Sequence, residues 1–418
     1  MRTNAIDPGG ENSKATPGAG SVPRWRSRGR MIAGALGAAQ ILAWGSSYYL
    51  LAVLAGPISD SLPWSYSAVV AGLSLGLLAA AGISLGLGKL MARFGGRNVL
   101  AASSLFFAAG LLGIALSHHY PAYLASWVLV GVAMGIGFHE AAFAAVVRLR
   151  DVDARGAITI VALATGFTSA VCWTLSALML EHFGWRGVCV AYAALHLGVG
   201  LPLNFLALSA DATEEPSRSG PVAGTLRAPP GAWLTALLAL GAGLGAGISA
   251  FVSVHMLTVL QQQYMLSLPA AVALGAFISP AQVGARVIEM LVGRHWHPIW
   301  TMLGSTLLYL ASCVLLLFKF PSAILPLILY GGGLGLRSVA RGTLAHAITG
   351  GVGYAQLLGR IATVSLCVQA ATPWVGARLI ETVGVAGALL CLSAVAFANV
   401  ICDGLIFLLR GEKQAIQT

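Results

Sequence analysis

The sequence predicts an all-α integral membrane protein with twelve transmembrane helices, arranged as two pseudo-symmetric bundles of six. Three observations predict this class. Of the 418 residues, 57% are hydrophobic and only 9% are charged, whereas a soluble domain carries about 25% charged residues. Apolar runs long enough to cross a bilayer recur along the chain, and features of the first half return in the second half at a fixed offset.

Twelve apolar runs account for most of the chain. Each holds about 20 residues or more, enough for a hydrocarbon core of ~30 Å. Because the backbone must satisfy its own hydrogen bonds in lipid, runs of this length predict helices. The runs are residues 31–56, 67–91, 98–117, 121–147, 157–181, 186–208, 232–257, 269–292, 297–318, 321–347, 353–381 and 385–409.

Polar segments delimit the predicted domains. The apolar stretch after the basic N-terminal segment runs for about 26 residues, so it predicts a spanning helix rather than a cleaved signal peptide. The predicted organisation is a disordered cytoplasmic tail (1–30), an N-terminal six-helix bundle (31–208), a central cytoplasmic loop (209–231), a C-terminal six-helix bundle (232–409) and a cytoplasmic tail (410–418).

The Lys and Arg residues are concentrated in alternate segments between the runs, as in membrane proteins whose cytoplasmic loops are positively charged. If the N-terminus is cytoplasmic, the inner segments hold 17 of the 24 Lys and Arg residues, and the outer loops hold only Arg186 and Lys319. This asymmetry predicts cytoplasmic termini in a bacterial-type inner membrane. Since the net charge of +10 lies between spans, it argues against a nucleic-acid partner. The six cysteines fall inside apolar runs without a CxxC pair and are expected to be buried hydrophobic residues.

The two halves read as repeats at an offset of 200 residues. Residues 131–187 align with 331–387, and Trp173 nearly meets Trp374. The matched pairs are Gly131 with Gly331, Gly135 with Gly335, Glu181 with Glu381, Gly184 with Gly384 and Gly187 with Gly387. Parallel six-helix repeats joined by a central loop are typical of one large class of transporters.

Residues 88–97, between the second and third runs, read GKLMARFGGR. This segment resembles the G-x-L-x-D-R-x-G-x-R loop signature of the major facilitator superfamily. The matching residues are Gly88, Leu90, Arg93, Gly95 and Arg97. The family's Asp is replaced by Ala92. In the family that Asp helps to latch the two halves on the cytoplasmic side, so the replacement affects the latch rather than the fold.

A second resemblance concerns the first two runs. The stretch from Trp44 to Ile58 and the segment LPWSYSAVVAGLSL at 62–75 are similar to the first helices of bacterial monocarboxylate and oxalate/formate-type porters. The fold resemblance covers residues 31–409. It implies alternating access around a central site that is lined by the first, fourth, seventh and tenth spans.

Ionisable residues inside the runs are the candidate site residues, because each costs about 2.5–3.5 kcal/mol to insert. Glu140, in the fourth run, is expected to face the water-filled path and to carry a proton. The alternative is that Glu140 pairs with an Arg and only holds helices together. His139 points about 100° away on a helix, so it is expected to pack.

Arg337 and Arg341 lie four residues apart in the tenth run, on one helix face. Two stacked guanidiniums form a clamp for a carboxylate or oxyanion. Two alternatives stay open, a salt bridge from Arg341 to Glu140 and snorkelling of Arg341 to the inner surface. In the eighth run, Arg286 and Glu289 are expected to neutralise each other at i, i+3.

Aromatic and amide side chains form a second candidate lining. Gln40, Trp44 and Tyr48 are spaced by four residues in the first run, so they share one stripe and are expected to line the cavity. Near the outer end of the eleventh run, Arg378 and Glu381 are expected to form a structural ion pair.

Together these features predict a secondary transporter of a small solute, in particular a monocarboxylate-like organic anion coupled to protons or exchange. One alternative is efflux of drugs or metalloids by way of the aromatic stripe or thiols such as Cys172 and Cys367. Another is a non-transporting membrane sensor. No GxxxxGK[ST], HExxH or CxxC motif occurs, so we expect no enzyme, cofactor or metal site. The expected partners are a small solute and the lipid bilayer, and the protein is expected to be monomeric.

Overall fold

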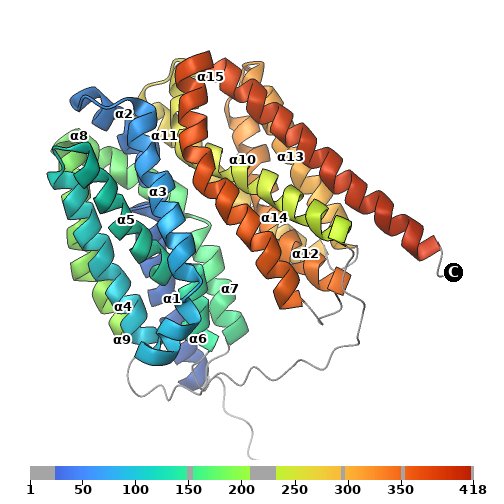
Figure 1. Ribbon diagram of the computed structural model, residues 1–418, viewed down its shortest axis with the longest axis horizontal. Helices are drawn as coiled ribbons and strands as arrows, with labels where there is room; N and C mark the ends of the chain where they lie inside the picture. Colours follow the sequence, from blue (N-terminus) through green and yellow to red (C-terminus); the bar gives the residue numbers. More distant parts are fainter. Residues whose placement is uncertain (1–23, 148–153, 208–231, 293–296, 350–353, 416–418) are drawn as a thin grey trace, which may run out of the picture.

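The computed structural model describes residues 24–147, 154–207, 232–292, 297–349 and 354–415, and over these ranges every element is a helix (Figure 1). The central loop 209–231, most of the tail 1–30 and the end of the tail 410–418 lie outside the described residues. The N-terminal half contains α1 (Arg24–Gly45), α2 (Leu50–Ser61), α3 (Tyr66–Ser84), α4 (Leu87–Leu116), α5 (Tyr120–Gly137), α6 (His139–Val147), α7 (Ala154–Thr165), α8 (Thr168–Leu195), the π-helix η1 (His196–Gly200) and α9 (Leu201–Ala207).

The C-terminal half contains α10 (Ala232–Tyr264), α11 (Leu268–Gly275), α12 (Ile278–Val292), α13 (Pro298–Leu317), α14 (Ile324–Thr349) and α15 (Tyr354–Ala415). In the described residues, nine helical stretches are long and apolar enough to cross a membrane, and Gly156–Thr165 and Ile324–Ala340 are shorter apolar helices. Two of the nine stretches, Thr168–Phe205 and Ile361–Leu409, reverse direction at a glycine and so belong to two spans each. The described helices therefore make up the twelve predicted spans.

Three of the connections between spans are single glycines. Gly95, Gly184 and Gly384 have φ of 76°, 64° and 72° with ψ of 152°, 174° and 174°. This region of φ/ψ space is almost closed to residues with a Cβ atom. Gly184 and Gly384 are the pair that the 200-residue offset matches, so both halves reverse direction at the same point of the repeat.

The matched glycines also bring helices close together. A Cβ atom on Gly131 of α5 would overlap the backbone of Gly76 on α3, and one on Gly331 of α14 would lie 2.5 Å from the carbonyl of Ile278 on α12. Small residues at such positions let membrane helices approach to backbone contact. The fourth span therefore packs on the second as the tenth packs on the eighth.

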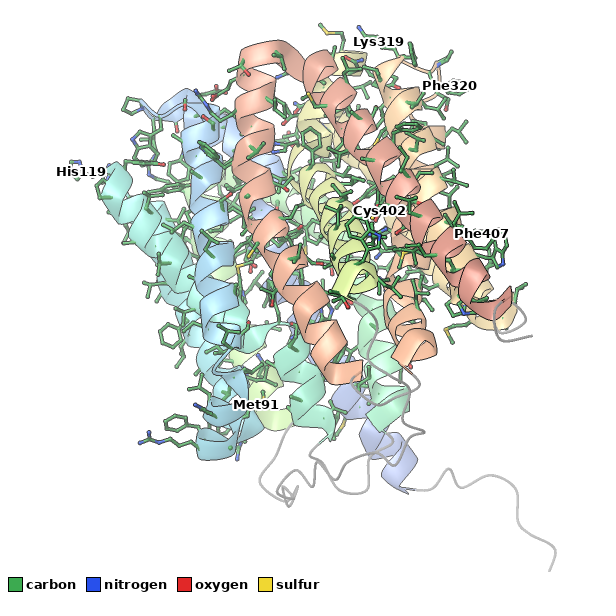
Figure 2. The ribbon with its side chains drawn as sticks, turned by 45° about the vertical axis from the view of Figure 1, so that its right-hand side comes forward. Met91, His119, Lys319, Phe320, Cys402 and Phe407 are labelled. Carbon is green, nitrogen blue, oxygen red and sulfur yellow. The ribbon has the colours of Figure 1, made fainter. Side chains whose placement is uncertain are left out.

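The two halves lean against each other at one end and separate toward the other (Figure 1). We call the end at which α1 begins the N-terminal face. The opposite end, which carries the α2–α3 turn, Gly184 and Gly384, is the distal face. Figure 2 shows Met91 near the N-terminal face, and His119, Lys319 and Phe320 at the distal face.

Candidate functional site

Four spans are interrupted where the two halves meet. The breaks lie at residues 46–49, at Phe138, at residues 166–167 and at residues 276–277. They are neighbours in space, since Trp44 stacks on Phe138 with ring centroids 4.0 Å apart and the hydroxyls of Ser169 and Ser279 are 2.9 Å apart. Discontinuous helices of this kind form the central sites of many transporters.

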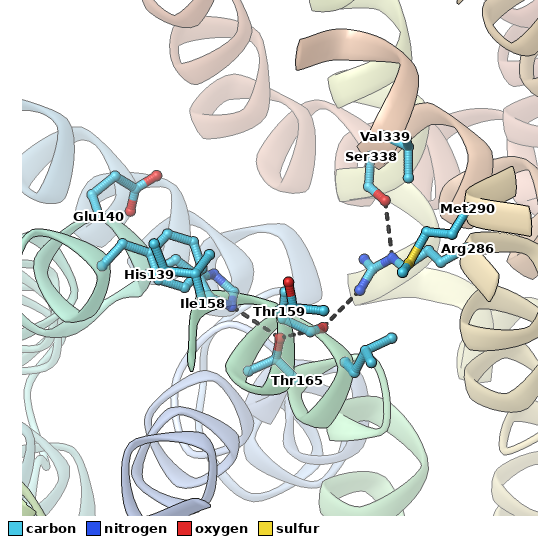
Figure 3. A pocket seen from close by; sticks show the side chains of 12 residues that line it. His139, Glu140, Ile158, Thr159, Thr165, Arg286, Met290, Ser338 and Val339 are labelled. Carbon is cyan, nitrogen blue, oxygen red and sulfur yellow. Dashed lines mark hydrogen bonds between the residues drawn. The ribbon is translucent and has the colours of Figure 1, made fainter. Parts of the chain in front are cut away.

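A cavity lies at these breaks, between the halves (Figure 3). It consists of two hollows of about 570 and 290 Å³ that share His139, Glu140 and Ser338 in their walls. The larger hollow extends toward the N-terminal face, because Phe143 and Met290 in its wall lie close to the ends of α6 and α12 on that side. Helices α1, α6 and α7 supply one wall, and α10, α12, α14 and α15 supply the other.

Glu140 lies in both hollows and is exposed to them. Among the described residues, no hydrogen-bond or ion-pair partner reaches its carboxylate. His139 lines both hollows as well. Its ring packs against Trp44 and Phe143, with ring centroids 5.0 and 5.5 Å apart, and its Nε2 lies 3.0 Å from Thr165 Oγ1.

Arg286 crosses from one half to the other. Its Nε donates to Ser338 Oγ at 2.9 Å, and its Nη1 donates to the carbonyl of Ala162, on α7 of the other half, at 2.8 Å. The expected pairing of Arg286 with Glu289 is wrong. Glu289 is buried toward α13 and accepts a hydrogen bond from Thr301 at 2.8 Å, so the two side chains leave α12 in different directions.

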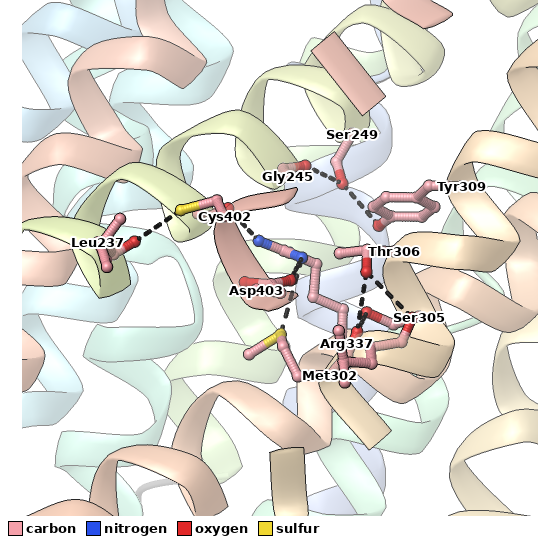
Figure 4. Close-up of polar contacts among 12 residues, drawn as sticks. Leu237, Gly245, Ser249, Met302, Ser305, Thr306, Tyr309, Arg337, Cys402 and Asp403 are labelled. Carbon is pink, nitrogen blue, oxygen red and sulfur yellow. Dashed lines mark hydrogen bonds and ion pairs between the residues drawn. The ribbon is translucent and has the colours of Figure 1, made fainter. Parts of the chain in front are cut away.

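Arg337 is 8% exposed and lines the smaller hollow. Its Nη2 donates to the carbonyl of Gly241, and its Nη1 lies 3.7 Å from Met302 Sδ and 3.9 Å from Asp403 Oδ2 (Figure 4). Asp403 is not among the residues predicted from the sequence, although a carboxylate inside the apolar run 385–409 is a sufficient signal. Arg341 lies on α14, one turn after Arg337, and its side chain is outside the described residues.

Of the predicted stripe, only Trp44 lines the cavity. Gln40 is buried and donates to the carbonyl of Gly137 at 2.6 Å, where α5 ends. Tyr48 is buried too, and its hydroxyl accepts a hydrogen bond from Gln369 of the other half at 3.1 Å. The stripe is divided because α1 ends at Gly45, between Trp44 and Tyr48.

Toward the distal face the halves are joined by polar contacts that we call the distal closure. Glu381 accepts hydrogen bonds from the backbone N–H and the hydroxyl of Ser67, both at 2.7 Å. The predicted ion pair between Arg378 and Glu381 is confirmed at 3.1 Å. His255 Nε2 donates to the carbonyl of Pro373 at 3.0 Å, so its Nδ1 accepts the hydroxyl of Tyr66 at 2.9 Å.

The loop motif lies on α4, on both sides of the reversal at Gly95. Arg97 donates to the carbonyl of Phe205 at 3.0 Å and lies 3.4 Å from the centroid of its ring. Arg93 lies 5.2 Å from the ring centroid of Phe94. These contacts remain within the N-terminal half. Gly88 and Leu90 precede the reversal, and Ala92, in the place of the family's Asp, is exposed.

Two six-helix halves around a central cavity that is closed toward one face define a membrane transporter. A profile of the Major Facilitator Superfamily matches residues 36–336. The chain therefore belongs to this superfamily, and it is a multi-pass secondary transporter rather than an enzyme. Comparison with curated proteins gives no match.

Solved structures share the fold at low identity. The D323A mutant of the nucleoside transporter NupG is 13% identical, with a TM-score of 0.73 over 91% of this chain and 100% of that one. A bacterial homologue of the human lysosomal transporter Spinster, inward-facing and occupied, is 16% identical, with a TM-score of 0.67 over 93% and 97%. The human organic anion transporter MFSD10 is 15% identical, with a TM-score of 0.61 over 91% and 100%. The resemblance to monocarboxylate porters stays a prediction.

Proposed function

We propose that the protein moves a small organic anion across the membrane by alternating access, and that Glu140 carries the coupled proton. One observation supports this above the others. The guanidiniums of Arg286 and Arg337 line the cavity from α12 and α14, and the carboxylate of Glu140 is exposed in the same cavity. A guanidinium binds a carboxylate or another oxyanion through charge-assisted hydrogen bonds of fixed geometry. A carboxyl group in a partly desolvated cavity can bind and release a proton.

Arg286 and Arg337 have different tasks in this proposal. Arg286 donates hydrogen bonds to two neutral oxygens, in Ser338 and Ala162, so its charge is available to a solute. Arg337 has Asp403 as a counter-ion at 3.9 Å and is the second contact. Trp44 supplies an apolar wall for the carbon skeleton. Arg341, four residues further along the sequence, stays a predicted contact for the solute.

The proposed orientation places the N-terminal face in the cytoplasm of a cell with a bacterial-type inner membrane. The concentration of Lys and Arg in the segments on that side supports it. With the distal closure intact, the described conformation then gives the solute access from the cytoplasm. Proteins of this fold include an organic anion transporter and a D-xylose–proton symporter, so the architecture accommodates both an organic anion and proton coupling.

The test is uptake of labelled small organic acids into proteoliposomes, with and without an imposed pH gradient. We expect saturable carboxylate flux in the wild type. Arg286→Gln removes a charge-assisted contact worth about 1.5–3 kcal/mol, so transport efficiency should fall by roughly tenfold to a hundredfold. Glu140→Gln should leave some flux that no longer responds to the pH gradient.

The matched control is Arg186→Gln, which removes an Arg whose contacts, with the carbonyl of Ala115 and the ring of Trp185, lie within the N-terminal half and outside the cavity. This variant should retain the response of flux to the pH gradient. Folding of every variant is checked by size-exclusion chromatography in detergent. Absence of carboxylate flux in folded wild type would contradict the proposal. Panels of drugs and metalloids would then test efflux, and absence of any flux would favour a sensor.

A further inference from the structure

The C-terminal half contains a buried polar cluster that the proposed cycle does not use. It is centred on Asp403 of α15, which is 2% exposed. Asn399 lies one turn earlier on the same helix and is fully buried. Among the described residues, no hydrogen-bond partner reaches Asp403 Oδ2 or either polar atom of the Asn399 amide. Figure 4 shows Asp403 beside the guanidinium of Arg337.

Helices α13 and α14 contribute side chains to this cluster, and α15 itself contributes Cys402, the neighbour of Asp403. Helix α14 supplies the guanidinium of Arg337 at 3.9 Å. Helix α13 supplies the thioether of Met302, which contacts the same guanidinium. From α15 itself, the neighbouring thiol of Cys402 is directed away, to the carbonyl of Leu237 on α10, at 3.2 Å.

Helix α10 is shaped to leave room for this cluster. A Cβ atom on Gly241 would lie 2.8 Å from Asp403 Oδ1, and one on Gly245 would overlap the guanidinium of Arg337. Any larger residue at either position would displace the charged groups. The space next to Asp403 and Arg337 is therefore created by two glycines of α10.

The pseudo-symmetric half does without these charges. The offset of 200 pairs Asp403 with Leu203, and the extra residue of the π-helix η1 shifts this pairing to Asn204. Asn204 donates to the carbonyl of Leu100 at 3.2 Å and to Ser104 Oγ at 3.1 Å. A neutral, hydrogen-bonded amide is therefore compatible with the helix packing at this position, and the fold does not require a carboxylate there.

We infer that Asp403 is a proton-binding site, a second one beside Glu140. A buried carboxylate is poorly compensated for lost hydration when its counter-ion is 3.9 Å away and its Oδ2 has no hydrogen-bond partner in the part of the chain that the structure describes. Proton binding forms an O–H bond on the carboxylate and removes its charge. The amide oxygen of Asn399, one turn away on the same helix face, is placed to accept that O–H.

Protonation would also change the state of Arg337. With Asp403 neutral, the guanidinium loses its counter-ion and turns its charge toward the cavity that it already lines. This second step rests on the proposed transport of an anion. It predicts that anion and proton bind with positive coupling, and that release of the proton returns Arg337 to Asp403.

The experiment is infrared difference spectroscopy of the purified protein in liposomes, recorded during a pH titration without solute. The probe is the C=O stretching band of a protonated carboxyl group, identified by ¹³C-labelling of aspartate. Because the chain has five further aspartates, the contribution of Asp403 is the part of the wild-type band that is missing from Asp403→Asn. We expect this part to appear on acidification in the wild type and to persist in Glu140→Gln. In Arg337→Lys the midpoint of the band should shift, because the distance to the cation changes.

A band that is unchanged in Asp403→Asn would overturn the inference. If Asp403→Asn does not fold, Asp403→Glu takes its place. In that variant the contribution of Asp403 should disappear from the band of ¹³C-labelled aspartate and a new contribution should appear in the band of ¹³C-labelled glutamate. An unaltered aspartate band would overturn the inference equally. The band is measured without solute, so the two proposals separate. An Asp403 band without anion flux refutes only the proposed solute, and anion flux without the band refutes only the proton site.

Discussion

At the scale of single residues, Gly131 and Gly331 show how little room the helix contacts leave. In Gly131→Ala the new methyl group would overlap the backbone of Gly76, which cannot move without shifting α3. We expect a loss of about 1–3 kcal/mol in stability, as for an overpacked core, and a lower midpoint of thermal unfolding in detergent. Gly56→Ala, where nothing lies within 4 Å of the built Cβ, is the control and should unfold at or above the wild-type midpoint.

The side chains of the site show what a sequence can predict at this scale. Glu140 and Arg337 stood out because a charge inside an apolar run needs a purpose, and the same rule would have found Asp403. Their partners could not be predicted in this way. Spacing placed Arg286 beside Glu289, but the nearest acceptors for Arg286 are on α14 and α7, and spacing within one helix says nothing about the neighbouring helix.

At the scale of helices, the reversal at Gly184 allows a sharp test. A Cβ built there meets nothing within 4 Å, so Gly184→Ala should destabilise only through backbone strain, by about 1–3 kcal/mol. Gly184→Asn should do no better, because ψ of 174° lies outside the left-handed region that Asn tolerates. Thermal unfolding of both variants beside Gly404→Ala, an open helical position, checks this. An Asn variant as stable as the wild type would contradict it.

The spans could be predicted because length and hydrophobicity are sufficient for a helix in lipid. Their interruptions could not. Breaks at Phe138 and at residues 276–277 lie within continuous apolar sequence, and each follows a glycine, Gly137 or Gly275, by one or two residues. With 52 glycines in the chain, that signal has no specificity. The break at Phe138 decides that His139 and Glu140 share the cavity.

At the scale of the whole molecule, the distal closure determines which face is open. The carboxylate of Glu381 accepts two hydrogen bonds from Ser67 of the other half. Glu381→Gln removes the charge of this acceptor, so it should raise the fraction of molecules that are open at the distal face. Spin labels at positions 119 and 320, with the exposed Cys367 and Cys391 replaced by Ser, report the separation of the halves by pulsed electron paramagnetic resonance.

We expect a longer distance to gain population in Glu381→Gln. The control is Glu181→Gln, which alters the repeat counterpart at the same face and should leave the distance distribution unchanged, because Glu181 is exposed on the N-terminal half. An identical distribution in wild type and Glu381→Gln would show that the remaining contacts, including Tyr66 with His255, hold the closure by themselves.

The single-glycine reversals also bear on how the chain enters the membrane. The fifth and sixth spans, and the eleventh and twelfth, are each joined by one residue, Gly184 or Gly384. Such a connection offers no hydrophilic loop to be carried across the bilayer separately from its helices. We therefore expect each pair to be inserted as one helical hairpin, so that the last two spans of either half become membrane-embedded in a single event during synthesis.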